Sequence, residues 1–277
     1  MELSFKLLDL INKGYVINDI ISELNISYEE VYKLIRDLNQ LGFLFNKKYY
    51  STGDILYLPK KDINRGNKNN SVNIITDLGS NVLRLMLVSD LHIGSNYESV
   101  KSWDDLYNYC IINNIHMIVI VGDFLDGINV GRTESKMHSN SLEQIEYARS
   151  KYPFDKNILN FMILGNHDID SLISDGIDLA TYLNNYRPDI VPIGYGNGII
   201  NIKNDKLLLA HPLCIGVSNT HDLSSNYILI KGHQHLSKSI IGNNGNCSLC
   251  VPSLSNLFLN ENQFLPGAID LSIKFRG

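Results

Sequence analysis

Residues 85–92 read Leu-Met-Leu-Val-Ser-Asp-Leu-His, an apolar run that ends in two side chains able to bind a metal ion. A short apolar run closed by polar residues is typical of a buried strand in an α/β sheet. We therefore predict a strand over Val82–Val88, with Asp90 and His92 just past its end. Side chains two residues apart on extended chain point the same way, so we expect these two to face one ion.

The same arrangement recurs four more times along the chain. Further strands are predicted at 117–121, 161–164, 207–209 and 227–230, and the ligand-type residues that follow them are Gly122-Asp123, Gly165-Asn166-His167-Asp168, His211 and Gly232-His233-Gln234-His235. Helices are predicted between the strands at Trp103–Ile112 and Leu142–Lys151. In open α/β sheets, active sites form beyond the carboxyl ends of the strands, so these side chains are expected to meet.

Carboxylate, imidazole and amide oxygen are ligands that suit divalent manganese, iron or zinc. A single His after a strand is more often a core residue with satisfied hydrogen bonds. Five such strand ends in this order are hard to reach by chance, and they contain five of the eight histidines; His116, His138 and His221 lie outside the set. We expect Gly165 and Gly232 to permit the backbone turns that aim the ligands inward.

Taken together, these motifs resemble those of the calcineurin-like metallophosphoesterase superfamily over residues 82–256. The resemblance implies an α/β fold, a β-sandwich flanked by helices, and two divalent metal ions. Manganese is the expected metal, with iron, zinc or nickel as alternatives. By the same resemblance, the first ion would be held by Asp90, His92, Asp123 and His235, and the second by Asp123, Asn166, His211 and His233.

The resemblance also implies a mechanism for cleaving phosphate esters. A hydroxide that bridges the two ions attacks the phosphorus. His167 binds neither ion and contacts the scissile phosphate or protonates the leaving oxygen. We expect Asp126 and Asp168 to orient ligands through hydrogen bonds, with turn or capping roles as the alternative. In the polar loop 127–140, Arg132 and His138 are candidates for substrate contact, although the loop could equally be solvated.

The first 59 residues predict a small separate domain of three helices and a β-hairpin. The helices are expected around Phe5, Leu8 and Ile11, over Ile17–Leu24, and after an N-cap at Ser27, where apolar residues recur at Val31, Leu34, Ile35, Leu38 and Leu41. The hairpin is expected from 43–50 and 55–58. This is the element order of a winged helix-turn-helix domain.

In such a domain the third helix and the wing contact nucleic acid. The candidate nucleic-acid-binding residues are Lys33 and Arg36 on the third helix and Lys47 and Lys48 in the wing. Docking of a protein partner, or a purely structural role, is the alternative for this unit. The polar stretch 60–70 predicts a linker, and residues 71–277 form the predicted phosphoesterase domain.

Composition narrows the class of protein. At 44% hydrophobic and 19% charged residues, the 277-residue chain is typical of a globular protein. We see no secretory signal pattern at Met1–Lys6 and no long apolar run, so we expect a cytoplasmic protein without a membrane partner. A net charge of -5 is not that of a strongly basic nucleic-acid coat protein. The pair Cys247-x-x-Cys250 has no matching second pair and is predicted to be structural.

Two stretches narrow the resemblance further. Asp90-Leu91-His92-Ile93-Gly94-Ser95 and Gly122-Asp123-Phe124-Leu125-Asp126-Gly127 are similar to the small, nuclease subunit of archaeal D-family DNA polymerases, and less so to repair exonucleases of this fold. The long N-terminal portion of those subunits is missing, and residues 128–140 do not match their motif.

The leading interpretation is a nuclease or other phosphodiesterase acting on DNA or RNA. One alternative is a phosphomonoesterase or a nucleotide phosphodiesterase. A third is a non-catalytic scaffold associated with DNA or a polymerase, although scaffolds of this fold usually lose ligands and here the whole expected set is present.

Overall fold

The computed structural model describes residues 2–60, 70–76, 81–130, 137–212, 227–241, 247–256 and 265–275, together with the short strands 258–259 and 262–263. Its helices are α1 (Glu2–Asn12), α2 (Ile17–Leu24), α3 (Tyr28–Gln40), α4 (Val100–Ile112), α5 (Ser141–Lys151), α6 (Asp170–Asp175) and α7 (Leu179–Tyr186). Its strands are β1 (Phe45–Tyr50), β2 (Ile55–Pro59), β3 (Ser71–Ile75), β4 (Val82–Val88), β5 (Met117–Val121), β6 (Leu159–Leu164), β7 (Ile190–Tyr195), β8 (Asn197–Ile202), β9 (Asp205–Ala210), β10 (Tyr227–Lys231), β11 (Lys238–Ile241), β12 (Cys247–Cys250), β13 (Phe258–Leu259), β14 (Asn262–Gln263) and β15 (Ile269–Lys274).

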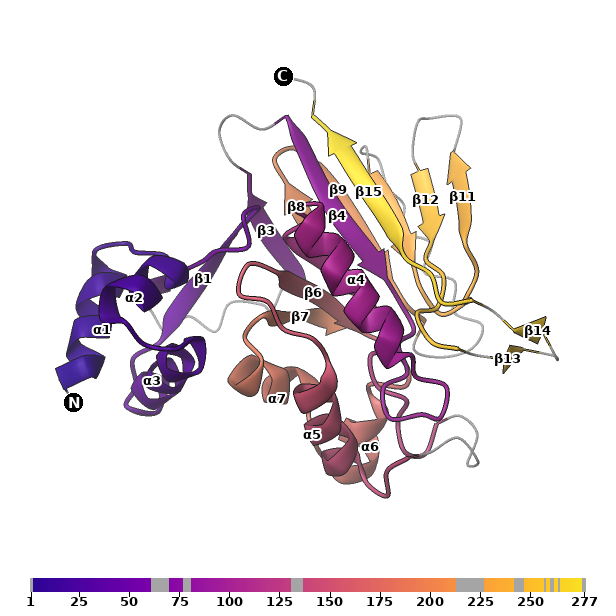
Figure 1. Cartoon of the computed structure of the whole chain (residues 1–277), viewed down its shortest axis with the longest axis horizontal. Helices are drawn as coiled ribbons and strands as arrows, with labels where there is room; N and C mark the ends of the chain where they lie inside the picture. The colour runs from indigo at the N-terminus through magenta and orange to yellow at the C-terminus, as the bar shows by residue number, and fades with distance from the viewer. Residues whose placement is uncertain are drawn as a thin grey trace.

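Two β-sheets packed face to face form the body of the molecule. One has five strands in the order β15-β4-β5-β6-β7, and the other has eight in the order β11-β12-β10-β9-β8-β3-β1-β2. Strands β4 to β7 run parallel, whereas β15 is antiparallel to β4. Helices α4, α5 and α7 cover the outer face of the five-stranded sheet (Figure 1). The predicted α/β sandwich flanked by helices is confirmed.

The apolar runs that predicted the strands are explained by burial on both faces of the five-stranded sheet. Along β4, Leu85 and Leu87 pack toward the other sheet, whereas Met86 and Val88 pack against the helices. Successive side chains of a strand point to opposite faces, so a strand covered on both sides carries no polar alternation. Trp103 of α4 is fully buried on the helical side.

Helices α1 to α3 and strands β1 and β2 form an N-terminal unit, called the head below, and they match the predicted helices and hairpin. Helix α3 begins at the predicted cap, where the Ser27 hydroxyl accepts from the Glu30 N–H at 3.2 Å and the Glu30 carboxylate accepts from the Ser27 N–H at 2.8 Å. The apolar face predicted for α1 is partly wrong, because Leu7 is buried and Phe5 is 65% exposed. A spacing of three residues left two faces open, and packing against α2 and α3 selected the one with Leu7, Leu10 and Ile11.

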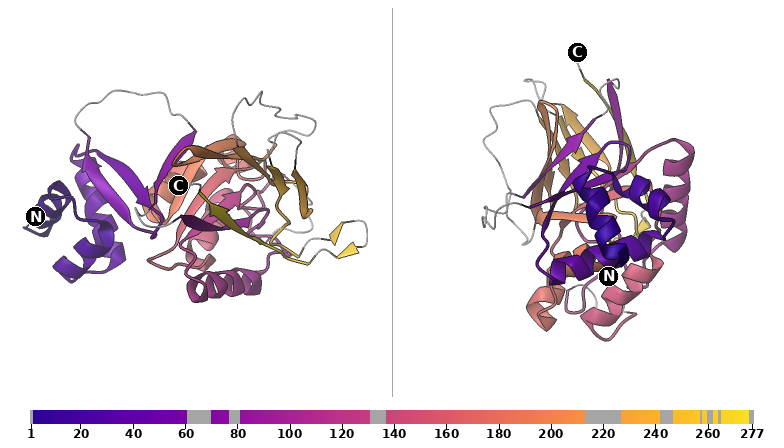
Figure 2. Two further views of the ribbon diagram at one scale, coloured as in Figure 1. Left: turned by 90° about the horizontal axis from the view of Figure 1, so that it is seen from above. Right: turned by 90° about the vertical axis from the view of Figure 1, so that its left-hand side faces the viewer.

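The head hairpin continues a sheet of the body. Strand β1 pairs antiparallel with β2 and parallel with β3, with Tyr49 opposite Ile74. The Tyr49 ring meets the Phe161 ring edge-on at 5.4 Å, and the apolar residues of the head and the sandwich form one continuous core. The head lies at one end of the molecule and the β13–β14 hairpin at the other (Figure 2). The winged helix-turn-helix assignment and the domain boundaries stay predictions.

The cysteine pair falls on strand β12, which pairs with β10 and β11. Cys250 is buried and both thiols are unpaired. Within the described ranges, no group of side chains with metal-ligand geometry contains a cysteine. This placement fits the structural role predicted for the pair.

No helix in the described ranges is both long and apolar enough to cross a bilayer. The cytoplasmic location stays a prediction.

Candidate metal centre

The predicted metal ligands come from both sheets of the sandwich. Asp90 and His92 follow β4, Asp123 follows β5 and Asn166 follows β6, all on the five-stranded sheet. The remaining ligands follow two strands of the eight-stranded sheet, His211 after β9 and His233 and His235 after β10. Because β4, β5 and β6 run parallel, their carboxyl ends share one edge, and there the two sheets bring the ligands together.

Asp90, His92 and His235 form the first cluster. The ligand atoms of the three side chains lie within 4.8 Å of one another. Asp90 Oδ1 lies 3.0 Å from His235 Nε2 and 4.0 Å from His92 Nε2. Burial opposes ionisation of Asp90, but the hydrogen bond from His235 and the charge of His211 hold the pKa of its carboxyl below the usual value. An ionised, buried carboxylate with two imidazoles is a donor set for a divalent cation.

Asp123, His211 and His233 form the second cluster, and Asn166 joins it. His211 Nε2 lies 3.0 Å from Asp123 Oδ2 and 3.2 Å from Asn166 Oδ1. Asn166 Oδ1 also lies 3.1 Å from His233 Nδ1. The two clusters are joined by the His233 N–H, which donates to Asp90 Oδ2 at 3.0 Å. All four residues predicted for the second ion therefore converge.

The hydrogen bonds at the far sides of two imidazoles show that the site fits cations. His211 Nδ1–H donates to the Val121 carbonyl at 2.7 Å, so the lone pair of neutral Nε2 faces the oxygens of Asp123 and Asn166. His92 Nδ1–H donates to Asp126 Oδ1 at 3.2 Å, which leaves His92 Nε2 buried without a hydrogen-bond partner. Electron-rich atoms arranged in this way require a cation between them.

In the absence of metal, a proton can take that place on His211. Burial lowers the pKa of His211, but the Asp123 carboxylate outweighs burial and raises the pKa to about 9. The same pairing lowers the pKa of the Asp123 carboxyl, although burial opposes it. A metal ion that binds here must therefore displace a proton.

The backbone of the ligands differs from the predicted extended geometry, which was wrong. Five ligands have left-handed φ angles: Asp90 (54°), His92 (48°), Asp123 (52°), His233 (75°) and His235 (55°). In the described part of the chain only three other non-glycine residues do, Asn25, Asn114 and Lys203. Each ligand sits after its strand has ended, where the chain turns toward the neighbouring loops. Such strained conformations persist where surrounding contacts fix them and are characteristic of functional sites.

Two glycines have a different role from the one predicted. Neither Gly165 nor Gly232 has a left-handed φ. A Cβ on Gly165 would lie 2.2 Å from Asp123 Oδ1, and one on Gly232 would lie 2.2 Å from Ser89 Oγ. These two positions are glycine because the ligand loops approach closely. Gly122, directly before the ligand Asp123, is a glycine with a left-handed φ, +88°.

His167 lies beside both clusters. Its Nδ1–H donates to the Asp126 carbonyl at 2.6 Å, and its Nε2 lies 4.0 Å from Asp123 Oδ2. Its ring packs perpendicular to that of His92 with a centroid separation of 4.6 Å. The side chain keeps 16% of its surface exposed, so it is not sealed from solvent.

The two predicted supporting carboxylates act in different ways. Asp126 contacts the ligand His92 directly, as described above. Asp168 accepts from three backbone N–H groups, those of Phe124 (3.2 Å), Leu125 (2.8 Å) and Gly165 (2.8 Å). Burial and the nearby charge of Asp123 raise the pKa of Asp168 to about 7. Asp168 therefore ties together the two loops that carry Asp123 and Asn166, and contacts their backbone.

Two supporting residues had no role in the sequence prediction. Ser253 Oγ donates to the Asp90 carbonyl at 2.8 Å and so holds the left-handed turn after β4. The Asp170 carboxylate accepts from the N–H groups of Ile128 (2.6 Å) and Asn129 (2.8 Å) in the loop after Asp123. Asp170 could have been predicted as a supporting residue, because it lies two positions after Asp168 in the sequence. Ser253 could not, because it lies far from Asp90 in the sequence.

Of the two candidate substrate contacts, His138 is not part of either cluster. His138 packs against the Tyr147 ring at 4.8 Å, and its buried Nε2 has no hydrogen-bond partner. Arg132 lies outside the described residues. A substrate role for either residue stays a prediction.

The four candidate nucleic-acid-binding residues lie in the head and differ in their surroundings. Lys33 and Lys48 are exposed. Arg36 donates to the Asn185 carbonyl at 2.8 Å and lies over the Tyr186 ring at 5.4 Å, so it links the head to α7. The Lys47 ammonium lies 5.6 Å from the centre of the Tyr57 ring.

Comparison with known proteins agrees with this geometry. The family profile described as calcineurin-like phosphoesterase matches residues 83–258, more than half of the chain. Among curated proteins, none matches the chain significantly. Similar solved structures include the phosphoesterase YfcE from E. coli, with 18% identity, coverage of 62% of this chain and 80% of that chain, and a TM-score of 0.40. Another is the nuclease MPE from Pseudomonas putida, with 19% identity, coverage of 67% and 82%, and a TM-score of 0.36.

Proposed function

Because the chain belongs to the calcineurin-like phosphoesterase family, we propose that it is a two-metal phosphodiesterase that hydrolyses DNA or RNA. The observation that carries the proposal is the convergence of seven ligand-type side chains into two adjoining clusters, with His167 beside them. Asp90, His92, Asp123 and His235 would hold one ion. Asp123, Asn166, His211 and His233 would hold the other. Manganese is the expected metal.

Bound divalent ions supply a nucleophile at neutral pH and neutralise the charge that develops on the phosphate. The protein's own side chains do the rest. His167 Nδ1–H is held by the Asp126 carbonyl, so Nε2 is the atom that carries a proton toward a leaving oxygen. Asp123 Oδ2 lies 4.0 Å from that nitrogen. His167 is therefore the proposed general acid.

The surroundings of the arginines favour a phosphodiester over a terminal phosphate as substrate. A terminal phosphate carries more negative charge, and arginine forks commonly clamp it. Within the described ranges, the arginine side chains are engaged elsewhere: Arg36 with Asn185, Arg84 with Asp270, Arg149 with Glu146 and Arg187 with Asp189. In this part of the chain, a substrate phosphate at the candidate metal centre would therefore meet the metal ions and His167 but no arginine clamp.

The choice of nucleic acid rests on two further observations. The motifs Asp90–Ser95 and Gly122–Gly127 resemble those of a polymerase-associated nuclease subunit. The head has the helix and strand order of a winged helix-turn-helix domain, with Lys33 and Lys48 exposed. A head that docks a protein partner is the alternative, and it would leave hydrolysis unaffected when the head lysines are replaced.

The test is cleavage of end-labelled single-stranded DNA, double-stranded DNA and RNA by manganese-loaded protein. We expect shortening of at least one substrate, and a loss of about 100-fold or more in rate for His167→Ala, since general acid catalysis contributes about that much. His116→Ala is the matched control, because His116 contacts the Asn157 carbonyl away from both clusters and its loss should leave the rate unchanged. Intact nucleic acids in a metal-loaded sample, with hydrolysis of p-nitrophenyl phosphate, would instead identify a phosphomonoesterase.

A further inference from the structure

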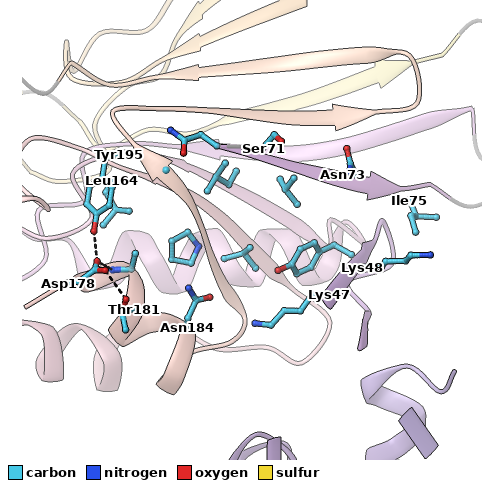
Figure 3. A pocket seen from close by; sticks show the side chains of 18 residues that line it. Lys47, Lys48, Ser71, Asn73, Ile75, Leu164, Asp178, Thr181, Asn184 and Tyr195 are labelled. Carbon is cyan, nitrogen blue, oxygen red and sulfur yellow. Dashed lines mark hydrogen bonds between the residues drawn. The ribbon is translucent and has the colours of Figure 1, made fainter. Parts of the chain in front are cut away.

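A cavity of about 530 Å³ lies where the head hairpin meets the body (Figure 3). Its walls are residues of β1, β3, β6, β7 and α7 and of segments next to them, and none of the seven candidate metal ligands lines it. The volume is in the range of pockets that enclose drug-sized organic ligands. The cavity is therefore separate from the metal centre and large enough for a small molecule.

Lys47 and Lys48 both line this cavity, and the ammonium directed into it is that of Lys47. Its partner is the Tyr57 ring, and in the described part of the chain no carboxylate pairs with its ammonium. Burial lowers the pKa of Lys47 to about 8. Figure 3 shows its ammonium directed toward Asn184 across the hollow, whereas the ammonium of Lys48 points the opposite way, past Ile75. A partly desolvated cation without a counter-ion favours the binding of an anion.

The carboxylate in the wall, Asp178, forms its hydrogen bonds with groups other than the Lys47 ammonium. Its Oδ1 accepts from the Ala180 N–H at 3.0 Å and from the Tyr195 hydroxyl. Its Oδ2 accepts from Thr181 Oγ1 at 2.7 Å. Asp178 is thus committed to capping α7, and no ion pair joins it to the Lys47 ammonium.

The remaining walls suit an organic anion with a ring system. Asn184 offers an amide group, while Val72 and Val191 supply a buried apolar floor. Asparagine amides can pair with the edges of nucleobases, and apolar side chains pack on their faces. We propose that this cavity binds a nucleoside monophosphate, with the phosphate at Lys47 and the base against the apolar floor. Binding here does not depend on the proposed hydrolysis.

A short chain of hydrogen bonds connects the cavity to the metal centre. Leu164 lines the cavity and directly precedes Gly165 and Asn166. Its carbonyl accepts from the Gly196 N–H at 2.7 Å, and the Gly196 carbonyl accepts from the His211 N–H, also at 2.7 Å. A ligand packed on Leu164 therefore contacts the segment that positions Asn166 and His211.

The test is calorimetric titration of the full-length, manganese-loaded protein with AMP. Asp123→Asn serves as the background, because Asp123 is a proposed ligand of both ions and does not line the cavity, so the change weakens phosphate binding at the metal centre and leaves the cavity intact. In that background we expect AMP to bind, and Lys47→Met to weaken it about tenfold or more through loss of the charge-assisted contact. Lys48→Met, on the same strand, is the matched control and should leave the affinity unchanged. Adenosine, which lacks the phosphate, should bind about tenfold or more weakly.

Two results would overturn the proposal: no AMP binding in the Asp123→Asn background, or equal affinities of the Lys47→Met and Lys48→Met proteins. The melting temperature of the empty protein separates ligand binding from folding. Removing an unpaired, desolvated cation should leave it unchanged or raised, and Lys47→Arg should retain AMP binding. A clear fall in melting temperature for Lys47→Met would mean that Lys47 is structural, and the proposal would fail.

Discussion

Replacing Asp168 with alanine is expected to lower the free energy of unfolding by about 3–5 kcal/mol. The Asp168 carboxylate is fully buried and accepts from the N–H groups of Phe124, Leu125 and Gly165. Each donor left buried without a partner costs about 1–3 kcal/mol. The total falls toward the lower end of the sum, because the change also removes a buried charge whose pKa is raised to about 7 by burial and by Asp123.

Asp168→Asn is the informative companion variant. Its amide oxygen at the Oδ2 position would still accept from Phe124 and Gly165, whereas its NH₂ group would face the Leu125 N–H. One donor then lacks a partner, so the expected loss is about 1–2 kcal/mol. The order wild type, Asn, Ala in stability follows from counting acceptors and does not depend on the absolute values.

The assay is urea unfolding in excess EDTA, so that metal binding does not contribute to the measured stability. Asp104→Ala, on the exposed face of α4, is the control and should lie within about 0.5 kcal/mol of wild type. If Asp168→Ala lay within about 1 kcal/mol of wild type, the three hydrogen bonds could not be holding the ligand loops, and the reasoning would be refuted.

Three further predictions concern the metal centre and the head. In the folded, metal-free protein the pKa of His211 is raised to about 9, above its value in the unfolded chain. The His211–Asp123 ion pair therefore makes its full contribution to the stability of the fold below about pH 6.5, and that contribution is lost as the pH rises through about 9. Metal displaces that proton, so calorimetric manganese affinity should rise about tenfold from pH 7 to 8, and a constant affinity would contradict the pairing. Gly165→Ala should abolish tight manganese binding, because the new Cβ would lie 2.2 Å from Asp123 Oδ1. Gly14→Ala is the control and should retain manganese, because no atom lies within 4 Å of a Cβ built there. Equal metal content of the two variants would refute the close-approach argument. Ser27→Ala removes the capping box of α3 and should cost about 1 kcal/mol in urea unfolding without changing metal content.

The strands that carry the ligands were predictable because their burial produces short apolar runs in the local sequence. Strands β4 and β5 have the predicted bounds, since both faces are covered and each apolar run begins and ends with the strand. Helix α3 was predictable from Ser27 and its periodic apolar residues for a similar reason. The positions of the ligand motifs were predictable because each motif directly follows the end of a strand.

The backbone of the ligands was not predictable in the same way. Asp90 adopts a left-handed φ that is held by Ser253, distant in sequence, and by the His233 N–H on its carboxylate. These contacts exist only after both sheets have formed. A local pattern such as Asp-x-His identifies the ligand types, but it does not define the direction in which they point.

The join between head and body was also beyond the sequence. Parallel pairing of β1 with β3 links segments on either side of a polar stretch and leaves no local signal. Strand β15 has a local sequence signal, because Ile269, Leu271 and Ile273 alternate with polar residues. Its pairing with β4 has none, because the two strands lie far apart in the sequence. Pairings of this kind depend on the whole fold.

Metal content measured by mass spectrometry after manganese loading tests the two-ion centre most directly. We expect two ions per chain in the unaltered protein. His92 belongs only to the first cluster and Asn166 only to the second, so His92→Ala and Asn166→Ala should each retain one ion, while Asp123→Asn should weaken both sites. A single ion per unaltered chain, or two ions in both single-cluster variants, would contradict the assignment of these side chains to a shared two-metal site.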